Sequence, residues 1–341
     1  MNNLTIRIGS RGSKLALWQA NHVAALLRAN GHTVEIEVIR TAGDRLQDPA
    51  FVAANSEAGL SPNGTGIFIK EIEEALAAGR IDLAVHSLKD LPTEIDPRFT
   101  LAAIPPRADA RDAFVCESSW GLHMLPSGAR VATTSPRRQA MLLALRPDLT
   151  FIEMRGNIDT RLRKWSEGEA DALVLASAGL DRLGLTEHVH QRFSVDELTP
   201  APGQGALALQ VRSPQHPLDT EDPTRDPAIH AAVRALNCAT TEYAVTAERA
   251  VLAALGGGCQ LPLGAYCHKV TASTEGIEAE IHHLHAMVVS PDGDQVAHVV
   301  QRAPVITAAA DLGQSVAEAL IARGAMELLR TEMLEQSTSQ S

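Results

Sequence analysis

The chain has 341 residues, of which 45% are hydrophobic and 21% are charged, and its formal net charge is −11. This composition is typical of a folded globular protein of two or three domains, and the acidic balance argues against general affinity for nucleic acid or anionic membrane. Aromatic residues make up only 3% of the chain, too few for the base-stacking platforms of proteins that bind single-stranded nucleic acid.

The first hundred residues alternate between strand and helix patterns. We predict a strand at 5–8, a helix after the turn at 9–13, a strand at 34–38, a helix at 67–78 and a strand at 81–85. The stretch 43–66 contains several Gly and Pro and has no period, so it predicts a long loop.

The alternation continues in the middle of the chain. Strands predicted at 130–133, 149–154 and 172–176 each lead into a helix, and Ser135 followed by Pro136 is typical of a helix N-terminus. This order predicts an α/β fold with parallel-type sheets covered by helices. The run 199–205 indicates a crossing between two lobes.

The pattern changes after about residue 226. Helices at 228–236 and 241–255 precede strands at 263–267, 278–289 and 295–301, and a long helix is predicted at 308–334. We therefore expect two α/β lobes and a smaller α+β domain: domain 1 at 1–105 and 205–225, domain 2 at 106–204, domain 3 at 226–335, and a polar tail at 336–341.

Cysteine content and hydropathy bear on the compartment. No window approaches the ~20 apolar residues of a membrane span, and the first residues do not resemble an export signal. The four cysteines form no C-x-x-C pair and are too few for a disulfide scaffold. Free thiols in a reducing cytoplasm are the expectation.

Basic residues are concentrated between residues 128 and 165, which contain eight Lys or Arg and three Asp or Glu. Arg137 and Arg138 open one predicted helix. Arg155 follows a predicted strand, and Arg161 lies in the helix after it. Strand ends and helix N-termini meet at one edge of an open α/β sheet, where N–H groups and arginine forks suit carboxylates or phosphates. The alternative for each arginine alone is a solvated surface position.

Two other side chains are candidates for chemistry. Cys259 follows three glycines, and such a loop can bring a thiol to a ligand at little steric cost, although a free cysteine is more often simply buried. Asp90 follows a predicted strand beside Lys89. In an arginine-rich crevice the Asp90 carboxylate would stay ionised and could stabilise a cation or transfer a proton. The alternative is that Asp90 only caps a turn.

Three nearby histidines, His282, His283 and His285, raise the question of a metal. Only His283 and His285 share a face of a strand, and the sequence offers no obvious third ligand beside them. We expect a solvated strand face and no metal site.

Seven stretches of the chain carry a family resemblance. In order, they are IGSRGSKLALWQA, HSLKDLP, ATTSPRRQA, MRGNIDTRL, LASAGLDRLGL, PAPGQGALALQ and GGGCQLPLGAY. Together they resemble porphobilinogen deaminase (hydroxymethylbilane synthase), and the α+β tail fits the third domain of that family. The resemblance implies a monomeric transferase whose first two lobes are like those of periplasmic binding proteins.

The resemblance also implies the chemistry. A dipyrromethane cofactor would be bound through a thioether to Cys259, and four porphobilinogen molecules would be condensed onto it, each with loss of ammonia. Hydrolysis would then release hydroxymethylbilane for porphyrin and haem biosynthesis. Every porphobilinogen carries an acetate and a propionate, so the growing chain is a polyanion.

Residue roles follow from the matching motifs. Asp90 would stabilise the azafulvene cation that ammonia loss creates. The expected cofactor contacts are Cys259, Lys89, Ser135, Arg137 and Arg138. The expected substrate contacts are Arg11, Ser13, Arg155, Arg161, Arg182, Gln204 and Gly205.

Two positions depart from the family pattern. Thr65 stands where members often have lysine, and Pro136 stands where leucine is common. Two other functions stay open from the residues alone. A non-catalytic two-lobed solute receptor would explain the arginines, and an acyl transferase would use Cys259 with a histidine base such as His268.

Overall fold

The computed structural model describes residues 3–40, 69–117, 121–215, 224–257, 261–274 and 277–329. The expected loop at 43–66, Thr65 and Cys259 lie outside the described residues. The chain divides into two compact units, Met1–Arg107 with Ala206–Glu242, and Ala108–Gly205 with Tyr243–Ser341. No described helix is long and apolar enough to cross a membrane.

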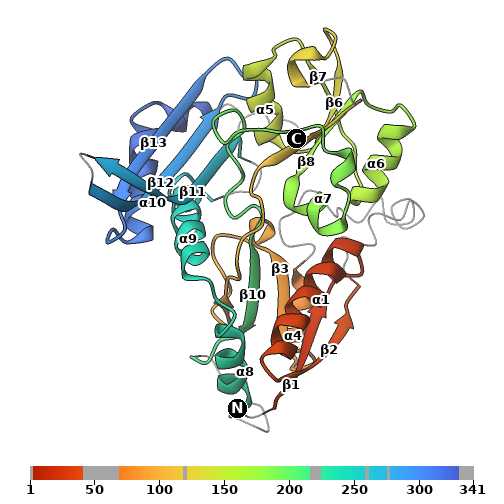
Figure 1. Ribbon diagram of the computed structural model, residues 1–341, viewed down its shortest axis with the longest axis vertical. Coiled ribbons are helices and arrows are strands. Elements are labelled where there is room, and N and C mark those ends of the chain that lie inside the picture. Colours follow the sequence, from red (N-terminus) through yellow and green to blue (C-terminus); the bar gives the residue numbers. More distant parts are fainter. Residues whose placement is uncertain are drawn as a thin grey trace, which may run out of the picture. The chain divides into compact units, whose positions relative to one another are not determined.

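The first unit is built on a five-stranded sheet in the order β2-β1-β3-β10-β4 (Figure 1). β1, β2 and β3 are parallel, whereas β10 is antiparallel to both of its neighbours. The elements are β1 (Thr5–Ser10), α1 (Lys14–Ala29), β2 (Thr33–Val38), α4 (Lys70–Ala77), β3 (Leu83–Ser87), η1 (Leu88–Asp90), β4 (Phe99–Ala103), β10 (Leu207–Arg212) and α8 (Arg225–Arg234).

Helices cover this sheet through two apolar clusters. α1 and α8 pack with the strands in one cluster, and α4 packs with Ile81, Ala84 and Phe99 in the other. α8 is also held by ion pairs, because Arg225 reaches the buried Asp82 at 2.7 Å. The expected start of domain 3 at 226 therefore lies within the first unit, since the apolar face of α8 is buried against this sheet.

The second unit contains a five-stranded sheet in the order β7-β6-β8-β5-β9. β6, β7 and β8 are parallel, and β5 is antiparallel to both neighbours, so β5 occupies the place that β10 has in the first sheet. The elements are β5 (Asp112–Val115), η2 (Leu122–Met124), β6 (Arg130–Ala132), α5 (Pro136–Leu145), β7 (Thr150–Ile152), α6 (Ile158–Ser166), β8 (Ala172–Ala176), α7 (Ser177–Leu183), η3 (Thr186–His188) and β9 (Gln191–Arg192).

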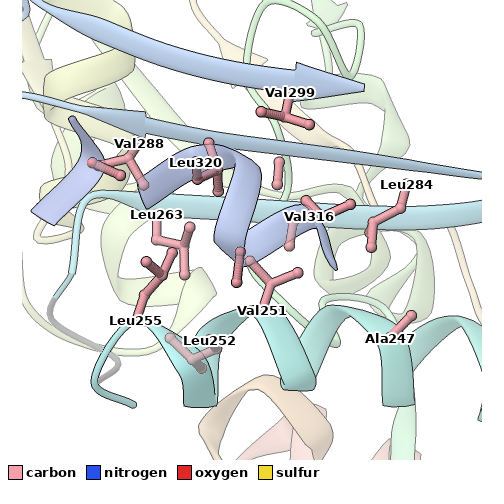
Figure 2. Close-up of a cluster of buried hydrophobic side chains, with 14 of the residues drawn as sticks. Ala247, Val251, Leu252, Leu255, Leu263, Leu284, Val288, Val299, Val316 and Leu320 are labelled. Carbon is pink, nitrogen blue, oxygen red and sulfur yellow. The ribbon is translucent and has the colours of Figure 1, made fainter. Parts of the chain in front are cut away.

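The same unit contains an antiparallel sheet in the order β11-β12-β13. Its elements are α9 (Ala239–Ala254), β11 (Leu263–Thr274), β12 (Ile277–Val289), β13 (Val296–Pro304) and α10 (Ala309–Ile321). Figure 2 shows α9 and α10 contributing Val251, Leu252, Val316 and Leu320 to the core on one face of this sheet. The hairpin at Gly293 meets α5: a Cβ there would lie 2.6 Å from the Ala144 nitrogen.

The α/β class with an α+β C-terminal part is confirmed, with two corrections. Both five-stranded sheets are mixed rather than wholly parallel, because β5 and β10 run against their neighbours. The helix expected at 308–334 breaks near Gly324, whose φ of +86° is left-handed and favours glycine.

Candidate functional site

In the first unit, four expected site residues follow strands of one parallel set. Arg11 and Ser13 come directly after β1, and Lys89 and Asp90 come directly after its parallel neighbour β3. The Ser13 hydroxyl accepts a hydrogen bond from the Ala16 nitrogen at 3.3 Å and caps α1. The carboxyl ends of parallel strands lie at one edge of the sheet, so the topology brings these groups to the same edge.

Asp90 is exposed at the end of η1. Among the described residues, its carboxylate makes no hydrogen bond or ion pair and caps no helix. The strand end behind it is fixed, since Gln19 of α1 donates to the Ser87 hydroxyl at 3.0 Å. The Asp90 carboxylate is therefore exposed and has no partner among the described residues, while the end of β3 before it is fixed by the hydrogen bond from Gln19.

In the second unit, Arg137 and Arg138 are buried in an ion-pair cluster around Asp112. Arg137 Nη2 lies 2.8 Å from Asp112 Oδ2, and its Nη1 donates to the Thr199 carbonyl at 2.7 Å. Arg138 Nη2 donates to Asp112 Oδ1 at 2.7 Å, and its Nη1 donates to the Val174 carbonyl at 3.1 Å. Ser135 caps α5 by accepting from the Arg138 nitrogen, which confirms the predicted helix start.

The two arginines determine the protonation state of Asp112 in this cluster. Burial raises the pKa of Asp112, but Arg137 and Arg138 outweigh burial and hold that pKa well below its usual range. One carboxylate and two guanidinium groups leave the cluster with one positive charge. Sequence reasoning missed Asp112, because a single acid at the start of an apolar strand carries no signal of the arginines that it meets after folding.

Arg161 differs from these two arginines. Its Nε donates to the Gly156 carbonyl at 2.8 Å, yet within the described part of the chain no carboxylate pairs with it. Burial, and then the charge of Arg138, lower the pKa of Arg161 to about 10. A half-buried cation next to another cation is unfavourable until an anion arrives.

Arg182 and Arg155 complete the predicted arginines of the second unit. Arg182 Nη2 donates to the Gly205 carbonyl at 2.7 Å, and burial lowers its pKa to about 10. Arg155 is exposed and pairs with Glu153 at 3.2 Å, an ion pair that water weakens.

The segment 203–205 is held from two sides. Gln204 is fully buried and donates to the Ala110 carbonyl at 2.7 Å and to Asp112 Oδ1 at 3.0 Å. Gly205 has φ +85°, and a Cβ there would lie 2.7 Å from the Ala108 carbonyl oxygen. Glu248 of α9, a second residue that sequence reasoning missed, accepts from the Gly203 nitrogen at 2.7 Å.

The histidines depart from the expected solvated strand face. His282 and His285 are buried, with 6% and 8% of their surface exposed. His282 stacks on Tyr243 with ring centroids 3.7 Å apart, while His285 bonds to Asp196 on the opposite face of the sheet. No disulfide joins the described cysteines, Cys116, Cys238 and Cys267, to one another.

Comparison with known proteins gives the family. Residues 6–220 match the family model "Porphobilinogen deaminase, dipyromethane cofactor binding domain". Residues 242–322 match "Porphobilinogen deaminase, C-terminal domain", which begins after α8, where the second unit resumes.

Relatives agree over nearly the whole chain. The porphobilinogen deaminase of Rubrobacter xylanophilus is 45% identical over 94% of this chain and 95% of its own length. That of Roseiflexus sp. is 44% identical over 95% of this chain and 98% of its own length. Among solved structures, the methionine-binding protein MetQ covers 68% of this chain and 93% of its own, with a TM-score of 0.41 and 12% identity. By the two family models and these sequence relatives, the chain belongs to the porphobilinogen deaminase family.

Proposed function

We propose that this protein is a hydroxymethylbilane-forming transferase of tetrapyrrole biosynthesis. It condenses four porphobilinogen molecules head to tail on a covalently held dipyrromethane, with loss of ammonia at each addition, and then releases the linear product by hydrolysis. Both family models and relatives that align over nearly the whole chain support this function. The single observation in the fold that carries it is Arg161, a half-buried cation that lacks a carboxylate partner among the described residues.

The donor set fits a pyrrole cofactor that carries acetate and propionate groups. Arg161 has an unbalanced charge, and the cluster of Asp112 with its two arginines has one positive charge in excess. We propose Cys259 as the attachment point, because three glycines precede it in the sequence. When bound, the dipyrromethane supplies the nucleophilic pyrrole carbon to which the first substrate pyrrole is joined.

The proposed roles of Arg137 and Arg138 take their burial into account. Their nitrogens are already engaged by Asp112 and by backbone carbonyls, so they act mainly by fixing the start of α5 and by lending positive charge to the carboxyl edge of the sheet. Ser135 caps that helix. Arg155, which is exposed, and Arg161 and Arg182, whose charged forms are strained by burial, are then the direct partners of substrate carboxylates.

Asp90 is proposed as the catalytic carboxylate. Its exposed oxygens accept no bond from a described residue, so they remain available to the pyrrole N–H groups and to the cation that develops when ammonia leaves. Lys89, Arg11 and Ser13 lie at the same sheet edge, where cationic and hydroxyl donors suit the acidic side chains of the substrate.

The deciding experiment is intact-protein mass spectrometry with peptide mapping. We expect an added mass of two pyrrole units on the peptide that contains Cys259, and hydroxymethylbilane as the product from porphobilinogen. Fully active protein with an unmodified Cys259 would contradict the proposal.

We also propose that the enzyme acts as a cytoplasmic monomer. The described cysteines form no disulfide with one another, and a reducing compartment keeps thiols in this state. All proposed groups come from one chain, so no second copy is needed for chemistry. Light scattering coupled to gel filtration tests the oligomeric state.

A further inference from the structure

Four histidines gather on the face of the β11-β12-β13 sheet that lies opposite the core shown in Figure 2. His268 of β11 is paired directly with His283 of β12, and His285 lies two residues further along the same face. One ligand atom from each of His268, His283 and His285 lies within 4.8 Å of the other two. Nitrogens that share a tetrahedral metal at ~2.0–2.1 Å are roughly 3.3 Å apart, so small side-chain rotations suffice to bring them to bonding distance.

Two of these imidazoles have a buried nitrogen without a hydrogen-bond partner among the described residues. His268 Nδ1 is buried and has no hydrogen-bond partner in the described part of the chain, and the same holds for the neighbouring His298 Nε2. Burial lowers the pKa of His268, and the neighbouring His285 and His283 lower it further. Burial likewise lowers the pKa of His283. A neutral imidazole has a lone pair on one of its ring nitrogens, and that lone pair can bind a metal.

One of the three histidines, His285, is hydrogen-bonded to a carboxylate. Asp196 Oδ1 lies 3.1 Å from His285 Nδ1, and an ionised carboxylate can only accept there. This bond places the proton of His285 on Nδ1 and leaves the lone pair on Nε2. Metal-binding histidines are commonly oriented in this way by a carboxylate on their other nitrogen.

We propose that His268, His283 and His285 bind a divalent transition-metal ion of the zinc type, with Asp196 orienting His285. Imidazole nitrogens suit Zn²⁺, Ni²⁺ and Cu²⁺ and are poor ligands for Mg²⁺ or Ca²⁺. The ion joins β11 to β12 through side chains that come from both strands. Its role is to fix the sheet, since none of the described residues proposed for catalysis or substrate binding belongs to β11, β12 or β13.

The test is calorimetric titration of Zn²⁺ into tag-free holoenzyme that has been stripped of metal with a chelator. We expect one equivalent per chain. His283→Gln, at a half-exposed position, should weaken Zn²⁺ binding at least tenfold, and Asp196→Asn should weaken it about tenfold to a hundredfold. The matched control is His123→Gln, which removes an exposed histidine outside the cluster and should leave the affinity unchanged.

Thermal melts without metal verify that each variant folds, and His268→Gln replaces His283→Gln if the latter does not. The proposal is overturned if Zn²⁺ gives no saturable binding at one equivalent, which would mean that the histidines only pack against one another. It is also overturned if neither His283→Gln nor His268→Gln weakens binding. If His298→Gln abolishes binding while those two do not, Asp196, His285 and His298 are the ligands instead, and the assignment is wrong.

Discussion

Replacing Arg161 by methionine separates a binding role from a structural one. Burial, and to a smaller extent the charge of Arg138, lowers the pKa of Arg161 well below that of a solvated arginine, to about 10. At about 1.4 kcal/mol per pH unit, the charged side chain lowers the free energy of unfolding by about 3 kcal/mol at neutral pH. The hydrogen bond from its Nε to the Gly156 carbonyl offsets about 1–2 kcal/mol of this cost. Arg161→Met should therefore leave the stability of the cofactor-free protein unchanged or raise it by about 1–2 kcal/mol.

Turnover should respond in the opposite direction. A charge-assisted hydrogen bond to a carboxylate contributes about 1.5–3 kcal/mol, so its loss should lower the rate of hydroxymethylbilane formation about ten- to a hundredfold. Turnover is measured in the otherwise unchanged enzyme. The melting temperature is measured in a Cys259→Ser background, so that no covalently held anion contributes to stability.

The matched control lies on the same helix. Arg163 is exposed and pairs with Glu167 at 2.7 Å. Arg163→Met should lower stability by no more than about 0.5 kcal/mol and should leave turnover unchanged. Normal turnover of Arg161→Met, with a larger loss of stability than Arg163→Met, would refute the binding role and make Arg161 a structural residue.

Three further substitutions have distinct expected outcomes. Asp90→Asn should have the melting temperature of the wild type, because the side chain is exposed and bonded to no described residue. Its turnover should nevertheless fall about a hundredfold or more, and near-normal turnover would remove Asp90 from the mechanism. Asp112→Asn should lower the free energy of unfolding by about 3–5 kcal/mol, measured by denaturant titration, because two buried arginines lose their counter-charge. Folding lowers the pKa of Asp112, so its charge stabilises the folded state fully above the pKa of an unfolded aspartate, about 3.9, and less as the pH falls toward the pKa in the folded state. The wild type should therefore lose more stability below about pH 4 than Asp112→Asn does. Parallel pH profiles of stability for the two proteins would contradict this. Cys259→Ser should fold but lack the pyrrole adduct in its mass spectrum and have no turnover, and an adduct found on another residue would move the attachment site.

Local patterns predicted most of the elements of the fold. The alternation of short apolar runs with amphipathic ones located β1, β2 and the strands before α5, α6 and α7, and the pair Ser135-Pro136 located the start of α5. The direction of β5 and β10 could not be predicted in this way. An apolar strand has the same sequence pattern whether its neighbours run parallel or antiparallel to it, and only the topology decides.

Long-range partners account for what was missed at the site. The sequence pattern singles out Arg137 and Arg138 but not their partner Asp112, which is 26 residues from Arg138 and belongs to a strand that has no other charge within it. The histidines show the same limit. His283 meets His268 only through the register of β11 against β12, which no local pattern of either strand specifies.

The position of β10 also bears on how the protein folds during synthesis. β10 lies between β3 and β4, so β4 joins the first sheet only through a strand that ends at Arg212. Every strand of the β7-β6-β8-β5-β9 sheet, by contrast, lies between Asp112 and Arg192 and is synthesised before β10. At about 5–20 residues per second, the ribosome needs roughly 5–20 s to travel from the end of β4 to the end of β10. The part of the chain made first thus completes its sheet after the part made second, and a nascent chain that stalls before residue 207 leaves β4 without a strand to pair with.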